Sequence, residues 1–235
     1  MNLPRFLFVL FLAASPAAAA GPLTGFPFTN ETLRYAIKWP SGVPMGEATV
    51  SATGENGGWR FEMNFNAGLP GFPFNDSYRS AVTADLCSVA LSRSITHGPK
   101  KVEEQTTFDQ QRHTAERRTL VPAGGGRSDL DLPVCAQDAL AYWFLARREM
   151  GQGRVPPAAK VFFGGPYQVS AQYTGAMDIT VGNKPETSDH LNVSIKGPAS
   201  DLTVEVFYAR DPARTPLLIR IPAPVGKVTL ELVRP

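Results

Sequence analysis

The chain has 235 residues, and its 23 Lys and Arg nearly balance its 21 Asp and Glu, which leaves a formal net charge of +2. Because the basic residues are scattered along the chain, this composition argues against nucleic acid as a partner. The 21 Gly and 21 Pro favour many short strands joined by turns and argue against a helical bundle.

Residues 1–20 have the features of a secretory signal peptide. Arg5 and the amino terminus supply positive charge, an apolar stretch follows over residues 6–14, and Ala20 is a small residue of the kind that signal peptidase needs. The stretch is too short to span a bilayer, which disfavours an uncleaved anchor. We expect cleavage after Ala20, a single β-rich domain over residues 21–235, and no transmembrane segment after cleavage.

Only two cysteines occur in the sequence, Cys87 and Cys135, and both lie in the part expected to be exported. An even pair in an oxidising compartment is most simply a disulfide. A metal site or a redox pair stays open as an alternative, although the chain lacks a CxxC spacing and a nearby histidine cluster. We predict a Cys87–Cys135 disulfide, no bound metal and no cofactor.

Alternating apolar and polar side chains run through the first half of the exported chain, which indicates strands with one buried face. In residues 59–66 a slip of one position would expose four large apolar side chains, so the register of this strand should be firmly set. Its apolar face consists of Trp59, Phe61, Met63 and Phe65. Further strands are expected at residues 33–39, 45–53, 75–84, 89–97, 102–108 and 113–120.

The period of the pattern changes from two to 3.6 after a glycine-rich loop at residues 123–126, which predicts an amphipathic helix. Arg147 and Arg148 lie near its end, and Gly151 follows as a stop signal. The apolar face of this helix consists of Ala136, Ala139, Leu140, Trp143 and Phe144.

Strand alternation resumes after the helix and continues to residue 232, which brings the expected total to roughly twelve strands. Several strands before the helix are polar on both faces in places, and this fits a sheet that is partly open to solvent. The predicted fold is therefore mainly β: a single strongly curved antiparallel sheet, forming a half-barrel or open barrel, with one α-helix packed on its concave side.

Known catalytic motifs are absent from the sequence. There is no GxSxG or HExxH, and the triple glycine at residues 124–126 lacks the Lys and Ser or Thr of a phosphate-binding loop. His97, His113 and His190 fall on separate expected strands or turns, where a surface position is the more common outcome. We therefore predict no catalytic residue.

A repeated tetrapeptide, GFPF, occurs at residues 25–28 and 71–74. The second copy, with Leu69 and Pro70, forms a loop between two expected strands, where alternation gives its phenylalanines no place in the sheet core. Such a loop either folds back to plug the core or presents an apolar patch to a ligand or partner.

Five segments resemble, in their order, a bacterial envelope family known as domain-of-unknown-function 3108. They are LRYAIKW at 33–39, GEA at 46–48, FNDSYRS at 74–80, QDAL at 137–140 and ARDPARTPLLIRIPAPVGKVTLEL at 209–232. The resemblance implies an exported, predominantly antiparallel β protein with no assigned activity. Its architecture is distantly similar to the half-barrels that carry lipoproteins and lipids across the bacterial periplasm.

These features favour a non-enzymatic periplasmic protein whose apolar groove binds a lipid-like ligand or a hydrophobic segment of a cell-envelope protein. Leu140, Trp143 and Phe144 would line the concave side, and Phe72 and Phe74 would guard its mouth. One alternative is an envelope scaffold that holds no ligand, and another is a hydrolase with a site that the sequence does not reveal.

Overall fold

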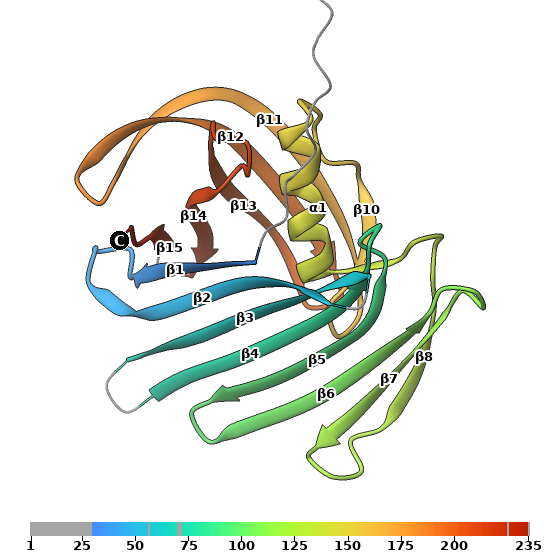
Figure 1. Ribbon diagram of the computed structural model, residues 1–235. Coiled ribbons are helices and arrows are strands. Elements are labelled where there is room, and N and C mark those ends of the chain that lie inside the picture. Colours follow the sequence, from blue (N-terminus) through green and yellow to red (C-terminus); the bar gives the residue numbers. More distant parts are fainter. Residues whose placement is uncertain (1–29, 56, 70–71, 225, 235) are drawn as a thin grey trace, which may run out of the picture.

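The computed structural model describes residues 30–55, 57–69, 72–224 and 226–234. The expected signal peptide and the first GFPF copy lie outside the described residues, as do Pro70, Gly71 and the side chain of Phe72. The described ranges form 15 strands and one helix (Figure 1).

The strands before the helix are β1 (Glu31–Lys38), β2 (Pro44–Glu55), β3 (Gly58–Leu69), β4 (Phe72–Thr83), β5 (Ser88–His97), β6 (Lys100–Asp109), β7 (Thr114–Val121), β8 (Arg127–Asp131) and β9 (Gln137–Asp138). The helix α1 (Ala139–Gly151) follows, and then come β10 (Ala159–Phe162), β11 (Pro166–Val181), β12 (Lys184–Gly197), β13 (Ser200–Ala209), β14 (Pro216–Ala223) and β15 (Gly226–Leu232).

All described strands belong to one sheet, in the order β8-β7-β6-β5-β4-β3-β2-β1-β15-β14-β13-β12-β11-β10-β9. Two meanders meet where β1 pairs with β15, and the sheet does not close into a barrel because β8 and β9 stand at its two ends. The prediction of one mainly antiparallel sheet with one helix is confirmed, except that β9 and β10 pair in parallel.

The expected strand count was too low because short strands show no readable alternation. β8 has five residues and β9 has two, so neither displays a period of two. After α1 the described chain forms six strands.

β3 has the register that its sequence predicts. Phe61 is fully buried at 0% exposure, and Trp59, Met63 and Phe65 on the same face are partly buried. Pairing with β2 and β4 on both sides holds this face toward the core. A shift of one residue would turn the other face of β3 toward the core, which carries Arg60, Glu62, Asn64 and Asn66.

α1 begins at Ala139 rather than at Ala136 because Asp138 caps it. Asp138 has an extended backbone, and its Oδ1 accepts hydrogen bonds from the amides of Leu140 at 2.9 Å and Ala141 at 3.1 Å. These contacts satisfy two amides that lack partners within the helix.

None of the helices in the described ranges is long and apolar enough to cross a membrane.

The expectation of an amphipathic helix was wrong in one respect, since nine of the 13 residues of α1 are buried. The helix contacts β3 and β4 in one half of the sheet and β10 in the other, so it is covered from several directions. In Figure 1, β10–β13 pass behind and beside α1 while β3–β5 run below it. A helix covered in this way needs no polar face.

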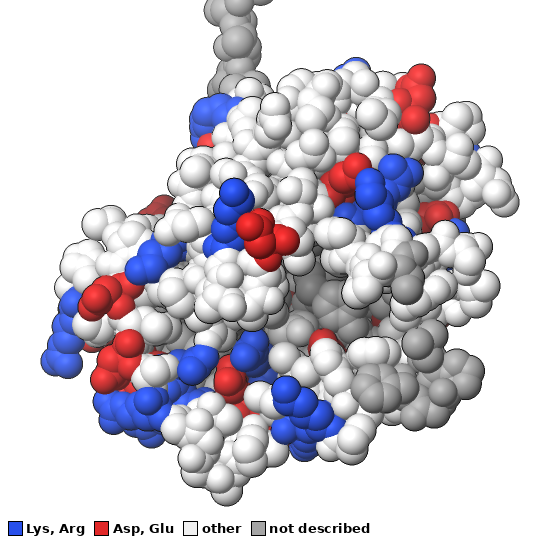
Figure 2. Space-filling view, turned by 180° about the vertical axis from the view of Figure 1, so that it is seen from behind, with Lys and Arg blue, Asp and Glu red and all other residues white. Residues whose placement is uncertain are grey.

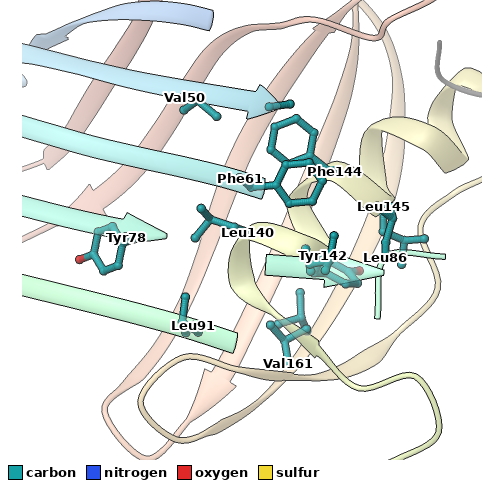
Figure 3. Close-up of a cluster of buried hydrophobic side chains, with 14 of the residues drawn as sticks. Val50, Phe61, Tyr78, Leu86, Leu91, Leu140, Tyr142, Phe144, Leu145 and Val161 are labelled. Carbon is teal, nitrogen blue, oxygen red and sulfur yellow. The ribbon is translucent and has the colours of Figure 1, made fainter. Parts of the chain in front are cut away.

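The main core lies between α1 and the strands that it contacts. The rings of Phe61 and Phe144 stack with centroids 3.9 Å apart and planes 11° from parallel. Leu140 points toward the same strands, close to Tyr78 and Leu91 (Figure 3).

Cys87 and Cys135 form a disulfide, as predicted. The bond joins the segment before β5 to the segment before β9 and α1, and Ser88 N donates to Ala136 O at 2.9 Å beside it. By the chain-entropy argument, closing a loop of this length, with a sequence separation of 48, stabilises the fold by about 4 kcal/mol.

Candidate functional site

The face of the sheet that contacts α1, called here the inner face, is buried at one end and partly exposed at the other. On β3, Phe61 beside α1 is fully buried, whereas Phe65 farther along is partly exposed. On β12 the same change occurs from Leu191 to Ile195. The residues stay apolar along both strands while their exposure rises.

Other strands also leave partly exposed apolar side chains at this end of the inner face, on β3–β5 and on β12–β15, and together they are called here the open-end surface. Asp76 lies between Phe65 and Ile95 in the register. The register places Val193 opposite Val204 and Ile221 opposite Val228, so these side chains lie on adjacent strands. The partly exposed residues of the surface are Phe65, Phe74, Ile95, Val193, Ile195, Val204, Ile221 and Val228.

The structure separates the five residues predicted to bind a ligand. Leu140 and Phe144 are buried in the core, at 3% and 1% exposure. Trp143 is partly exposed, and its buried indole Nε1 has no hydrogen-bond partner in the described part of the chain. Phe74 lies at the far end of β4, and the side chain of Phe72 lies outside the described residues.

Phe72 and Phe74 belong to a strand and not to a loop, which corrects the interpretation of the second GFPF copy. β3 extends to Leu69 and β4 begins at Phe72, and these two residues pair with each other in the sheet. Pro73 looked like a turn signal, yet the alternation of Phe74, Asp76 and Tyr78 continues through it. Phe74 therefore has a defined position on the inner face.

A polar group lies beside Phe74 at the open end. His97 Nε2 lies 3.0 Å from Asp76 Oδ1 and 3.1 Å from Oδ2, and Tyr78 donates to Asp76 Oδ2 at 3.1 Å. Burial raises the pKa of Tyr78, and the charge of Asp76 raises it further, so the Tyr78 hydroxyl stays protonated. The ring of Phe74 meets the His97 ring edge-on at 5.0 Å.

The sequence analysis missed two charged residues of the inner face, Arg93 and Glu104, which lie between Ile95 and the buried end of the sheet. Arg93 Nε donates to Glu104 Oε2 at 2.5 Å, and both side chains are largely buried. The signal was present in β5, where Arg93 occupies the same alternation phase as Leu91 and Ile95. A charged residue in an apolar phase needs a buried partner or a function.

The family comparison agrees with the sequence resemblance. A model described as "Protein of unknown function (DUF3108)" matches residues 34–233. The chain belongs to this family. No curated protein sequence matches the DUF3108 chain.

A solved structure has the same fold as this DUF3108 chain. It is described as "Crystal Structure of Beta-barrel-like Protein of Domain of Unknown Function DUF1849 from Brucella abortus". The TM-score is 0.62 at 8% sequence identity, over 88% of this chain and 97% of the other. At this identity the likeness concerns the fold alone.

Two motifs of the DUF3108 chain meet at the start of α1. Ser80, from FNDSYRS, and Ser88 each donate to Asp138 Oδ2 at 2.6 Å, and Asp138 belongs to QDAL. Burial raises the pKa of Asp138, and these hydrogen bonds oppose that shift. Because Asp138 is completely buried, the cluster anchors the helix rather than forming an accessible site.

The ARDPART segment of the DUF3108 chain is fixed by one acidic side chain. Asp189 accepts hydrogen bonds from Arg210 Nη2 at 3.0 Å, Arg214 Nη1 at 2.5 Å and the Tyr173 hydroxyl at 3.0 Å. Within the segment, Asp211 Oδ1 accepts from the amide of Thr215 at 3.0 Å. These contacts give the motif a structural role.

The same segment contacts α1 and β1. Arg147, fully buried, donates to Ala213 O at 3.2 Å and pairs with Glu31. Tyr35 donates to Pro216 O at 2.9 Å. The motifs at the two ends of the matched region are therefore joined in space.

His190 is buried at 7% exposure, contrary to the expected surface position. Its ring stacks on Phe207 at 4.3 Å, and its Nδ1 lies 2.6 Å from Thr174 Oγ1. A second apolar cluster containing Phe207 forms on the face of β13 opposite the main core, so this part of the sheet is covered on both faces.

A polar hollow of about 740 Å³ lies over β6–β8 on the opposite face from the open-end surface. Arg118 and Arg127 pair there with Glu116, so much of its charge is internally compensated. The view in Figure 2 shows basic and acidic side chains side by side in its lower left part. No three His, Cys, Asp or Glu side chains come together as metal ligands in the described ranges.

Proposed function

We propose that this DUF3108 protein is an exported, non-enzymatic binding protein for a lipid-like ligand. In this proposal the sheet is a half-barrel, the inner face is its concave wall, and α1 closes one end. The apolar chain of the ligand lies against the open-end surface, and Phe74 lies at the entrance.

The burial gradient carries the proposal. Each square ångström of apolar surface left in water costs about 25 cal/mol relative to its burial. Eight apolar side chains on the inner-face strands β3–β5 and β12–β15 remain partly exposed, whereas α1 covers the buried end of β3 and β4. A grouped apolar area of this kind is typical of a ligand or partner surface.

Export is supported by two independent features. Residues 1–20 have the composition of a signal peptide, and the Cys87–Cys135 disulfide is a bond that persists in oxidising compartments such as the bacterial periplasm. The intact mass of the protein taken from the envelope should correspond to a chain that begins at Gly21. A mass that includes residues 1–20 would contradict cleavage.

An envelope scaffold without a ligand is the second candidate. The observation in its favour is the polar hollow of about 740 Å³ over β6–β8, next to the sheet edge formed by β8. The main-chain groups of an edge strand can pair with another chain. The charged residues Arg127, Asp129 and Asp131 on β8 oppose such pairing, so we favour the ligand-binding function.

Fluorescence titration with N-phenyl-1-naphthylamine, an uncharged probe that brightens in apolar surroundings, tests the proposal. We expect saturable binding that oleyl alcohol displaces. Ile195→Gln should weaken probe binding about tenfold, because it places an amide in the apolar surface. Lys196→Gln, exposed on the other face of β12, is the matched control and should bind like the parent.

Absence of saturable binding by the parent protein would contradict the ligand-binding function and favour the scaffold. Equal weakening by both variants would show that the probe binds elsewhere. Native mass spectrometry of the protein purified from its own envelope would identify the natural ligand directly.

A further inference from the structure

Two arginines of the inner face converge on one glycine of the β10–β11 loop. Arg117 on β7 donates through Nη1 to Gly164 O. On β5, Arg93 packs so closely that a Cβ built on Gly164 would lie 2.5 Å from its Cζ. Gly164 also has a φ of +72°, a backbone conformation that favours glycine.

The charges around Gly164 do not balance. Glu104 pairs with Arg93 at 2.5 Å and also accepts from Thr119 at 3.4 Å. For Arg117, no carboxylate partner occurs in the part of the chain that the structure describes, and its contact there is the carbonyl of Gly164. The group therefore has two guanidinium charges and one carboxylate.

The nearest other carboxylate of the inner face makes no hydrogen bond to either arginine. Asp76, one strand away, contacts His97 at 3.0 Å and accepts from Tyr78 at 3.1 Å instead. A carbonyl oxygen is a weaker partner for a guanidinium than an anion, with which Arg forms charge-assisted and often bidentate hydrogen bonds. Arg117 is thus able to exchange its carbonyl partner for an anionic group.

This positive group lies at the inner border of the open-end surface. Arg93 and Ile95 point to the same face of β5, two residues apart, or about 7 Å along the strand. The Phe163 ring lies 5.6 Å from Arg93 Cζ and 5.0 Å from the Tyr78 ring, so apolar surface continues up to the guanidinium. A ligand lying on the open-end surface would bring its deeper end to Arg93 and Arg117.

We propose that Arg93 and Arg117 bind the anionic head group of a single-chain amphiphile, such as the carboxylate of a long-chain fatty acid. This inference rests on the proposed ligand-binding function and adds the charge of the ligand. The head group takes the place of the Gly164 carbonyl beside Arg117, and the alkyl chain extends over Ile95 and past the Asp76–His97 pair toward Phe65 and Phe74. Glu104, paired with Arg93 at 2.5 Å, competes with the head group for this guanidinium.

Displacement of N-phenyl-1-naphthylamine by oleate and by oleyl alcohol, both below their aggregation concentrations, tests this inference. The two compounds share a chain length and differ in head-group charge. The parent protein should bind oleate about tenfold more tightly than oleyl alcohol. Arg117→Gln should remove most of this preference, Arg117→Lys should keep part of it, and oleyl alcohol should bind all three proteins equally.

Two further variants complete the design. Glu104→Gln removes the competing carboxylate and should tighten oleate binding while oleyl alcohol binding stays constant; it keeps the test decisive if Arg117→Gln fails to fold. Arg79→Gln is the control, because Arg79 is 64% exposed on the opposite face of β4 and pairs with Glu62. This control should keep the oleate preference of the parent.

The possible failures are distinguishable. Equal affinity of the parent for oleate and oleyl alcohol would overturn the anion site and leave the proposed function intact. Loss of oleate preference on adding millimolar inorganic phosphate would overturn the amphiphile assignment and indicate a site for free anions. A parent protein that binds neither compound nor the probe would overturn the proposed function together with this inference.

Discussion

Ser80 on β4 donates a hydrogen bond of 2.6 Å to Asp138, the residue that caps α1. Ser88 on β5 donates to the same Oδ2 at 2.6 Å, and its Oγ accepts from the amide of Asp138 at 2.8 Å. One buried carboxylate therefore ties two strands to the start of the helix. The helix is the element that closes one end of the inner face, so this cluster decides whether the proposed ligand surface is formed.

Replacement of Asp138 by Ala should destabilise the fold by about 3 kcal/mol. The change removes a helix cap worth about 1 kcal/mol and leaves two buried hydroxyls without their acceptor, at about 1 kcal/mol or more each. Urea denaturation followed by circular dichroism measures the loss. Asp129→Ala, on a side chain that is 73% exposed, is the control and should change stability by less than about 0.5 kcal/mol.

A loss below about 1 kcal/mol for Asp138→Ala would contradict the anchoring role. Asp138→Asn separates the cap from the charge. The side-chain oxygen of Asn still accepts from the amides of Leu140 and Ala141. We therefore expect Asp138→Asn to retain more than half of the stability that Asp138→Ala loses.

The Cys87–Cys135 disulfide should contribute a comparable amount. The double variant Cys87→Ser/Cys135→Ser should lose about 2–4 kcal/mol of stability relative to the oxidised protein, because the unfolded chain regains the freedom of the closed loop. Thiol titration of the denatured, unreduced protein should find no free thiol. Two free thiols in protein taken directly from the envelope would contradict the bond as its natural state.

The strands with a clean alternation were predictable, and the reason is visible in β3. Each apolar side chain from Trp59 to Phe65 faces the core, so the sequence pattern and the burial pattern coincide. β9 has two residues, directly before α1, and pairs in parallel with β10. A contact of this kind depends on tertiary placement and leaves no local period to detect.

The positions of the predicted ligand residues could be anticipated only in part, for one physical reason. Phe144 and Leu140 were assigned to a ligand surface because they share an apolar helix face, yet an apolar face is equally suited to a core. Only the strands opposite decide between these outcomes, and Phe61 fills the space in front of Phe144. Arg117 could not be predicted, since its contact comes from Gly164, 47 residues away.

Phe74 and Phe144 should therefore respond differently to substitution. Phe144→Ala removes a ring stacked on Phe61 in a fully buried position and should cost about 3–5 kcal/mol. Phe74→Ser, at a partly exposed position, should cost less than about 1.5 kcal/mol while weakening binding of N-phenyl-1-naphthylamine. A large stability loss for Phe74→Ser with unchanged probe binding would indicate that Phe74 plugs the core.

The buried His190 should make stability depend on pH below neutrality. Burial is the largest effect and lowers the pKa of His190. The nearby charge of Glu205 opposes this shift, and the positive charges of Arg220 and Lys227 add to it. In the unfolded chain the imidazole titrates at about 6.5. Between that value and the lower folded pKa the unfolded state binds more protons, so stability falls as the pH falls through this window.

His190→Gln removes this titration and should flatten the profile between about pH 7 and pH 5, measured as the urea midpoint at each pH. The variant also loses the stack on Phe207 at 4.3 Å, so its stability at pH 7 should be lower than that of the parent. His113→Gln, at an exposed position, is the matched control and should keep the slope of the parent. A His190→Gln profile with an unchanged slope would assign the acid sensitivity to other groups.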